Sequence, residues 1–234
     1  SDYAYFSSFS DSWLRHVEEY AGHIIKRLGL GAESLVVELA SNDGYLLRNF
    51  VAREIPVLGV EPASNVADVA KAAGIPTIVK FFGVETAQDL VRDGKSADLL
   101  IGNNVLAHVP DLNDFVAGMK ILLKPDGLIT MEFPHLLQLT QNNQFDTIYH
   151  EHFSYFSFLT VQRIFEEHGL TLIDVEPLPT HGGSLRIYAM HSDQSSKRLS
   201  PRVKGMCAHE IDHGFDKMET YLKFGEQVKQ TKRL

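Results

Sequence analysis

Short apolar runs rich in β-branched residues alternate with helical segments through more than half of this chain. We expect strands near residues 35–39, 57–60, 77–79, 98–102 and 128–133. Such alternation predicts an α/β fold with a mainly parallel sheet that is covered by helices on both faces. Ligands of these sheets bind outside the carboxyl ends of the strands, so the residues after each strand are the first candidates for function.

Two further strands are expected near residues 170–175 and 184–190, after a helix near residues 160–168. Seven strands that end in such a pair predict the Rossmann-like fold of class I methyltransferases better than a six-stranded dehydrogenase fold. The 234 residues allow one large domain with a short helical addition. We therefore divide the chain into an N-terminal helical lid (1–30), a core (31–191), and a linker with a C-terminal helix (192–234).

The turn after the first expected strand predicts a nucleotide-binding site. It runs from Glu38 at the strand end through Ala40, Asn42 and Gly44 into a helix-like segment. Small residues let the backbone approach a ligand, and a helix N-terminus presents free N–H groups. A pyrophosphate-binding G-x-G-x-x-G loop needs more glycines than this turn has, so the turn suits a ligand without a phosphate there. The competing interpretation is plain packing, because buried strands often end in small residues.

A second acidic strand end follows about twenty residues further on. Glu61, with Pro62 after it, lies where a ribose-binding carboxylate sits in such folds. Two carboxylates without a phosphate loop indicate S-adenosylmethionine, whose ribose hydroxyls and sulfonium favour carboxylates, ahead of NAD. Phe82 and, at the fourth strand end, Asn103 and Val105 are further candidate cofactor contacts, although asparagines at a strand end also form ordinary Asx turns.

Both ends of the chain predict helices. Residues 13–28 have apolar positions at helical spacing, with Ser10 or Asp11 as the expected cap. This helix either packs on the sheet or serves as a lid whose Tyr and Ser side chains close over the methionine end of the cofactor. After a linker-like stretch from Ser192, residues 206–234 predict one long charged helix that leads into a further domain. Its apolar stripe comprises Ile211, Phe215, Met218, Leu222 and Val228.

Charge and cysteine content exclude several classes of partner. The formal net charge of −8 and the pI near 5.7 argue against binding to nucleic acids or anionic membranes. No apolar run is long enough to cross a bilayer. The single cysteine, Cys207, excludes a disulfide or a cysteine-based zinc cluster within this chain, and it favours a reducing cytoplasm.

The densest group of reactive side chains lies in residues 144–155, just after the fifth strand, and it contains Tyr149, His150, Glu151 and His152 in a row. An imidazole takes a proton near neutral pH, a carboxylate fixes its tautomer, and a phenol donates to a developing oxyanion. We rank an acid/base site first, a structural network second and a zinc site last, because His150 and His152 diverge in either a strand or a helix. His108, after the fourth strand, either faces the same site or is structural.

The segment from His181 to Arg186, with two glycines, enters the last strand. The glycines permit a tight bend and close approach of the backbone to a substrate. His181, Ser184 and Arg186 are candidates to bind substrate oxygens or phosphate, and the alternative is a simple β-turn.

Taken together, these motifs resemble the sugar C-methyltransferases, which act on nucleotide-linked keto-deoxysugars. The resemblance runs through residues 5–13, 38–47, 59–63, 103–111, 149–152 and 181–186, and so covers nearly the whole chain. It implies S-adenosylmethionine as the methyl donor and a sugar carbon beside a ketone as the acceptor. It also implies His152 as the general base, supported by Tyr149, Glu151 and His108.

The same resemblance implies flanking parts that we expect to be absent from this chain, namely an N-terminal zinc module and a C-terminal α/β domain. We expect that the present chain needs no metal. We also expect that it methylates carbon through an enolate intermediate. Three alternatives stay open at this point. They are an O- or N-methyltransferase of a small molecule, an NAD-dependent sugar dehydrogenase or epimerase, and a non-catalytic methyltransferase-like scaffold.

Overall fold

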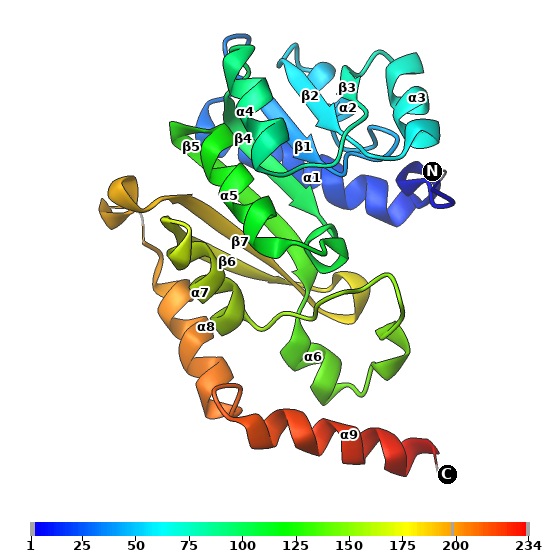
Figure 1. The fold of residues 1–234 in the computed structure, drawn as a ribbon, viewed down its shortest axis with the longest axis vertical. Coiled ribbons are helices and arrows are strands. Elements are labelled where there is room, and N and C mark those ends of the chain that lie inside the picture. Colours follow the sequence, from blue (N-terminus) through cyan, green and yellow to red (C-terminus); the bar gives the residue numbers. More distant parts are fainter. Residues whose placement is uncertain (1–2, 198, 233–234) are drawn as a thin grey trace. The chain divides into compact units, whose positions relative to one another are not determined.

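The computed structural model describes residues 3–197 and 199–232, and its seven strands form one sheet (Figure 1). The strands are β1 (Val36–Leu39), β2 (Val57–Val60), β3 (Thr77–Ile78), β4 (Ala97–Asn103), β5 (Leu123–Pro134), β6 (Leu170–Leu178) and β7 (Ser184–His191). Their order in the sheet is β3-β2-β1-β4-β5-β7-β6. β1 pairs in parallel with β2 and β4, and β6 pairs antiparallel with β7. The predicted class I methyltransferase fold, with a mostly parallel sheet, is confirmed.

Among the described residues, α-helices precede, separate and follow these strands along the chain, as the alternation predicted. They are α1 (Asp11–Leu28), α2 (Arg48–Val51), α3 (Ser64–Ala72), α4 (Val84–Arg92), α5 (Leu112–Leu122), α6 (Leu136–Gln141), α7 (Phe158–Glu167), α8 (Pro201–Asp212) and α9 (Met218–Lys232). At the start of α1 the Ser10 hydroxyl accepts from the backbone N–H of Trp13 at 3.3 Å, so Ser10 is the cap. Helix α1 ends at Leu28, and Gly29 caps it with a left-handed φ of 64°.

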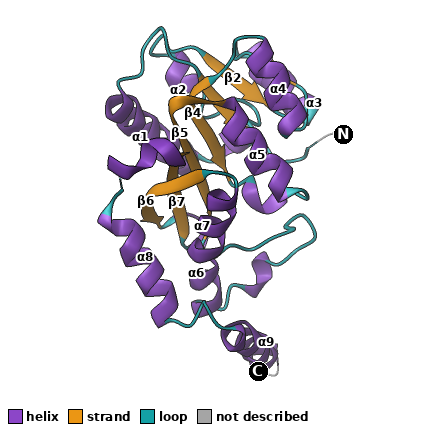
Figure 2. Ribbon diagram, turned by 60° about the vertical axis from the view of Figure 1, so that its left-hand side comes forward, coloured by secondary structure: helices purple, strands orange, loops and turns teal. Residues whose placement is uncertain are grey.

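The prediction of one helix over residues 206–234 is wrong. The structure has two helices, α8 and α9, with a bend between them (Figure 2). Gly214 in the bend has a φ of 76°, and a Cβ there would lie 2.6 Å from the Thr220 hydroxyl. Phe215 is buried in the bend, whereas Met218 is 69% exposed, so the expected stripe is not continuous. Arg233 and Leu234 lie outside the described residues.

The chain divides into two compact units. Unit 1 comprises Ser1–Gly102 and Ala117–Ile129, and unit 2 comprises Asn103–Val116 and Thr130–Leu234. In unit 1 every residue of β1 is buried, and α1 buries Val17, Ala21 and Ile24. In unit 2 the fully buried aromatic side chains are Phe133, Phe158 and Phe165. The segment boundaries predicted at residues 30 and 191 came from composition and stay predictions.

Candidate cofactor site and base cluster

The turn between β1 and α2, which we call the first turn (residues 40–45), has an unusual backbone. Ala40, Asn42 and Gly44 all have left-handed conformations, with φ of 54°, 50° and 78°. This conformation costs an alanine about 1–2 kcal/mol, and such costs concentrate at ligand-binding sites. The sequence shows small residues at these alternate positions but gives no sign that an alanine among them is left-handed.

Glu61, after β2, holds the first turn through its carboxylate. Its Oε2 accepts from the backbone N–H of Asn42 at 2.9 Å, and its Oε1 accepts from the N–H of Ala63 at 2.8 Å. Burial raises the pKa of Glu61, while these two hydrogen bonds lower it. A carboxylate has about four acceptor positions, so Glu61 retains acceptor capacity for ligand hydroxyls.

The segment before α1 lies against the first turn through its backbone. The Asn42 side chain accepts from the N–H of Ser7 at 3.0 Å and donates to the carbonyl of Tyr5 at 3.0 Å. The Asp43 carboxylate accepts from the N–H of Ser8 at 3.2 Å. Tyr5 is 54% exposed, so it is the main chain that covers this turn. Closure of Tyr and Ser side chains over a ligand stays a prediction.

Glu38, in β1, is completely buried beside these residues. Neither of its carboxylate oxygens has a hydrogen-bond partner of good geometry among the described residues. Burial raises the pKa of Glu38 well above its usual value. The Tyr45 hydroxyl lowers this pKa, and the neighbouring Glu61 and Asp43 raise it. The Ser41 hydroxyl and Asp43 Oδ1 are likewise buried and have no partner within the described part of the chain.

This donor and acceptor set fits S-adenosylmethionine. Three carboxyl groups, of Glu38, Asp43 and Glu61, suit a ligand that carries positive charge and hydroxyl or amino donors, and they oppose a pyrophosphate. Unmatched buried acceptors in a folded protein call for a bound donor, which such a ligand supplies. Pro62 is half-buried directly after Glu61, and Phe82 is half-buried beside Gly118. Cofactor contacts of individual residues stay predictions.

Replacing Glu38 by glutamine is expected to flatten the pH dependence of stability. A carboxyl group whose pKa is raised on folding binds more protons in the folded state. The free energy of unfolding therefore falls as pH rises from the unfolded pKa towards the raised value. Urea unfolding at about pH 5 and about pH 8 should show a smaller fall in Glu38→Gln, with a gain of about 1–3 kcal/mol at the higher pH. Glu18→Gln, on the exposed face of α1, is the control, and equal pH dependence in both variants contradicts the assignment.

The loop after β4 begins unit 2. Asn104 has a left-handed φ of 53°, and its N–H donates to the carbonyl of Glu132 at 2.7 Å. Asn103 Nδ2 and Asn104 Oδ1 are buried with no partner among the described residues. Val105 is also buried. This loop therefore offers an amide donor and an amide acceptor to a ligand.

Four aromatic rings meet in unit 2, and we call His108, Tyr149, His152 and Tyr155 the base cluster. The His152 ring lies 4.7 Å from His108, 4.3 Å from Tyr149 and 5.7 Å from Tyr155, measured between centroids. The N–H of Phe153 donates to the carbonyl of Ala107 at 2.8 Å, and this bond joins the two loops that carry the histidines. Three predicted residues are thus brought together.

The tautomer of His152 is set by its own loop. Its Nδ1 lies 3.1 Å from the carbonyl oxygen of Thr147, which can only accept, so Nδ1 carries the proton. Nε2 of the neutral ring then has a free lone pair. His152 is half-buried, whereas His150 and Glu151 are exposed. The tautomer is fixed by a backbone carbonyl, a role that the sequence assigned to a flanking carboxylate.

The neighbours of His152 are held in their neutral forms. Burial lowers the pKa of His108, and the charge of His152 lowers it further, against the raising effect of Glu151. Burial raises the pKa of Tyr149, and Glu151 and Tyr155 add to this. At neutral pH the cluster therefore contains a neutral imidazole and a protonated phenol around His152.

Tyr155 closes the predicted group of residues 144–155, but the sequence assigned it no role. Its hydroxyl is buried and has no hydrogen-bond partner among the described residues, although its ring contacts His152. It lies in the same run as Tyr149, three residues after His152, but sequence spacing does not show that its hydroxyl is buried and unmatched.

The predicted substrate residues 181–186 form a bend into β7. His181 is exposed and left-handed, with a φ of 51°. The Ser184 hydroxyl donates to the carbonyl of Thr180 at 2.9 Å. Arg186 is buried and pairs with Glu132 at 2.7 Å. Ser184 and Arg186 thus have protein partners, and a role of these residues in substrate binding stays a prediction.

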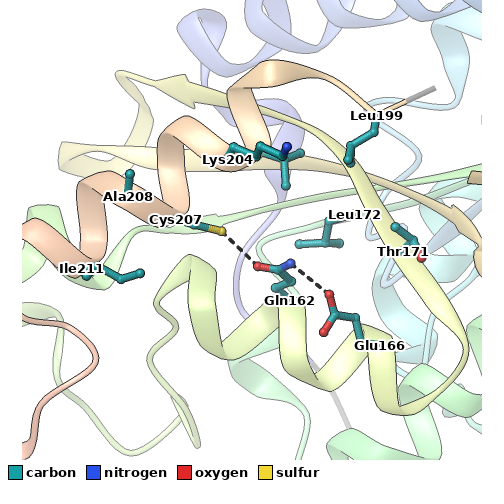
Figure 3. A pocket seen from close by; sticks show the side chains of 10 residues that line it. Gln162, Glu166, Thr171, Leu172, Leu199, Lys204, Cys207, Ala208 and Ile211 are labelled. Atoms are coloured by element: carbon teal, nitrogen blue, oxygen red, sulfur yellow. Dashed lines mark hydrogen bonds between the residues drawn. The ribbon is translucent and has the colours of Figure 1, made fainter. Parts of the chain in front are cut away.

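An open cavity of about 460 Å³ lies between α7, β6 and α8, away from the predicted site residues (Figure 3). On its α8 side the Cys207 thiol donates to Gln162 Oε1 at 3.0 Å, and Gln162 donates to Glu166 at 2.9 Å. Burial raises the pKa of the Cys207 thiol, and Glu210 and Glu166 raise it further. The thiol is therefore protonated at neutral pH and is not a nucleophile.

Two further observations bear on the site. Within residues 3–197 and 199–232, no group of three or more His, Cys, Asp or Glu side chains is placed to hold a metal ion. No helix in the described part of the chain combines the length and the apolar character that a membrane span needs.

The strand order and the first turn together define a class I methyltransferase domain. Comparison with known proteins agrees. Residues 13–175 match the family model of the methyltransferase domain, and residues 179–234 match the C-methyltransferase C-terminal domain. The chain therefore belongs to the methyltransferase-domain family. The expectation of an S-adenosylmethionine-dependent methyltransferase is confirmed at the level of this family.

One relative agrees with this assignment, and two solved structures share the fold. The chain is 38% identical over 222 residues to the C-methyltransferase NovU of Streptomyces niveus. The matched residues cover 95% of this chain and 53% of NovU. The PH0226 protein of Pyrococcus horikoshii has a TM-score of 0.64 at 17% identity, covering 80% of this chain and 94% of that one. Magnesium protoporphyrin IX methyltransferase of Synechocystis, solved with bound SAH, has a TM-score of 0.60 at 15% identity, covering 76% and 83%.

The present chain spans about half the length of NovU. The C-terminal family model begins at residue 179, before the boundary predicted at residue 192. Residues 179–234, with the bend before β7 and helices α8 and α9, therefore belong to the C-terminal domain model, which the sequence interpretation placed outside this chain.

Proposed function

We propose that this chain transfers a methyl group from S-adenosylmethionine to a carbon atom next to a ketone in a nucleotide-linked deoxysugar. The observation that carries the proposal is the 3.1 Å contact between His152 Nδ1 and the Thr147 carbonyl, which orients the ring and leaves Nε2 to act as the base within the aromatic cluster. A ketone acidifies the adjacent C–H bond, so an imidazole is a suitable base for this proton.

In this proposal each residue of the base cluster has a role. His152 Nε2 takes the proton from the sugar carbon, and the electron pair of the broken C–H bond moves into the enolate. A neutral phenol, of Tyr149, donates a hydrogen bond to the enolate oxygen, and the neutral His108 supports the same oxygen. Glu151, which is exposed, acts through its charge on the His108 and Tyr149 pKa values.

The cofactor is held by unit 1 in this proposal, through Glu61 and the carboxyl groups around the first turn. When bound, S-adenosylmethionine supplies an electrophilic methyl group. The role of Glu61 is to bind ribose hydroxyls, and Asp43 provides negative potential for a cationic ligand. The raised pKa of Glu38 favours its protonated form, so its role is that of a hydrogen-bonding partner. A nucleotide-sugar acceptor and a cytoplasmic location are part of the same proposal, and they rest on the resemblance and on the single cysteine.

Proton exchange tests the function directly. The full chain, mixed with a nucleoside diphosphate-linked keto-deoxysugar in D₂O without cofactor, should introduce deuterium at the carbon next to the ketone. Addition of S-adenosylmethionine should then give a product with a new C–CH₃ signal in NMR. A product methylated on oxygen or nitrogen, with no exchange at carbon, assigns the chain to the alternative reaction. Failure to bind S-adenosylmethionine in calorimetry supports the non-catalytic scaffold.

A further inference from the structure

The base cluster sits mainly on one long loop, which we call the base loop (residues 142–157), between α6 and α7. His152 and Tyr149 lie near its middle, and the loop holds one 3-10 turn (Phe145–Thr147) but no α-helix or strand. Catalytic groups must be held within about 0.5 Å of their working positions. A loop of this length needs fixed points outside itself.

One buried carboxylate joins the start of α7, directly after the base loop, to the residue directly before α6, the helix that leads into the loop. Glu210, on α8, is completely buried, and its Oε1 accepts from the N–H of Phe158 at 2.6 Å. The same oxygen lies 2.7 Å from Nε2 of His135, which precedes α6 and is also buried. Its Oε2 accepts from the N–H of Leu159 at 2.9 Å. The two N–H groups open helix α7, where a negative charge is favoured.

Further bonds connect the same part of the chain to residues after 179. The N–H of His135 donates to the carbonyl of Gly183 at 3.0 Å, and Gln144 Nε2 donates to the carbonyl of Gly182 at 2.8 Å. Asn143 Nδ2 donates to the Thr231 hydroxyl at 2.7 Å. All these partners, like Glu210, lie within residues 179–234, the stretch that matches the C-methyltransferase C-terminal domain.

We propose that Glu210 is a positioning residue that sets the place of His152 by holding the start of α7 to His135, because α6 and the base loop lie between these two points of the chain. The C-terminal stretch thereby controls the reactivity of a base that lies in the methyltransferase-domain match. The expected effect of Glu210 on catalysis rests on the proposed function. Its effect on the position of the base loop does not. The mechanism uses no property of Glu210 itself, and Glu210 does not touch the base cluster in any described contact.

The chemistry of the site makes glutamine an informative replacement. Glu210 needs both oxygens as acceptors, because three donors face them. Glutamine has nearly the same shape, but one oxygen becomes an NH₂ group that faces an N–H donor. Glu210→Gln therefore loosens one end of the base loop without opening a cavity. Cys207→Ala is the matched control. It lies one turn away on α8 and bonds to α7 through Gln162, without touching the ends of the base loop.

The experiment combines structural and catalytic readouts on the full chain. Hydrogen exchange followed by mass spectrometry should show faster exchange across residues 142–157 in Glu210→Gln, with unchanged exchange in α1 and the first turn. Under the same conditions kcat should fall about 10- to 100-fold, because a shift of about 1 Å in a reacting group can cost 100-fold. Affinity for S-adenosylmethionine should equal that of the unchanged protein. Cofactor-free deuterium incorporation into the keto-sugar should fall in parallel with kcat.

The outcomes separate this inference from the proposed function. If the unchanged protein neither introduces deuterium into the sugar nor methylates it, the proposed function fails. The amide hydrogen exchange of residues 142–157 still decides whether Glu210 holds the base loop. Equal loop exchange in Glu210→Gln and the unchanged protein overturns the inference. A uniform rise in exchange across both units, or an equal loss of kcat in Cys207→Ala, also overturns it, because Glu210 then stabilises the fold in general.

Discussion

Replacing His152 by alanine should reduce methyl transfer by about 10²–10⁴-fold while S-adenosylmethionine still binds with unchanged affinity. The variant removes Nε2 of the imidazole whose Nδ1 lies 3.1 Å from the carbonyl oxygen of Thr147. It leaves unit 1 intact, because His152 belongs to unit 2. Single-turnover rates and cofactor titration by calorimetry measure the two effects separately. Deuterium incorporation into the keto-sugar should be lost together with methyl transfer.

His150→Ala is the matched control for this prediction. It removes the same kind of side chain two residues away. His150 is exposed, and its ring centroid lies 6.3 Å from that of Tyr149, compared with 4.3 Å for His152. We expect close to full activity from it. Wild-type turnover in His152→Ala removes His152 from the role of base. Equal losses in both variants indicate that the loop, rather than one imidazole, has been disturbed.

Replacing Glu61 by alanine should weaken S-adenosylmethionine binding by about 10- to 1,000-fold. The change leaves the buried N–H groups of Asn42 and Ala63 without their acceptor, and hydrogen bonds to a charged group contribute about 1.5–3 kcal/mol each. It also removes the proposed partner of the ribose hydroxyls. Each 1.4 kcal/mol corresponds to a factor of about ten in affinity. Calorimetric titration of the full chain measures the loss.

Glu61→Gln distinguishes the two causes of this loss. Glutamine retains one acceptor for Ala63 but presents an NH₂ group to the N–H of Asn42, so affinity should be intermediate. Glu85→Ala, at an exposed position on α4, removes the same charge from unit 1 without touching the first turn. Affinity equal to that of Glu85→Ala in both Glu61 variants shows that the cofactor binds elsewhere.

The strands were predictable because each is an apolar run between polar turns. β2 has the predicted bounds, and β1 and β3 differ by one residue. β5 begins at Leu123, five residues before its predicted start, because Lys124, Pro125 and Asp126 interrupt the apolar pattern although their backbone is extended. The C-terminal helix was predicted too long because apolar residues keep helical spacing across Gly214, where only the backbone conformation reveals the break.

The candidate site was predictable only in its outline. Glu38, Glu61 and His152 are recognisable because acidic strand ends and a run of reactive side chains are local patterns. The acceptor of the His152 N–H is a carbonyl five residues away, and the unmatched Tyr155 hydroxyl depends on burial. Glu210 meets His135 across 75 residues, a tertiary contact for which neither sequence position gives a sign.

The left-handed Ala40 and Asn42 have a consequence for how a ligand would be received. With glycine at these positions the turn would adopt several conformations in the absence of the ligand. Binding would then have to restrict the turn to one conformation, at a cost in entropy. With alanine and asparagine, the energetic cost of the left-handed conformation is part of folding, so the turn already has one conformation before the ligand binds. Substituting Ala40 by glycine should therefore relax the folded protein while slowing the capture of its nucleoside.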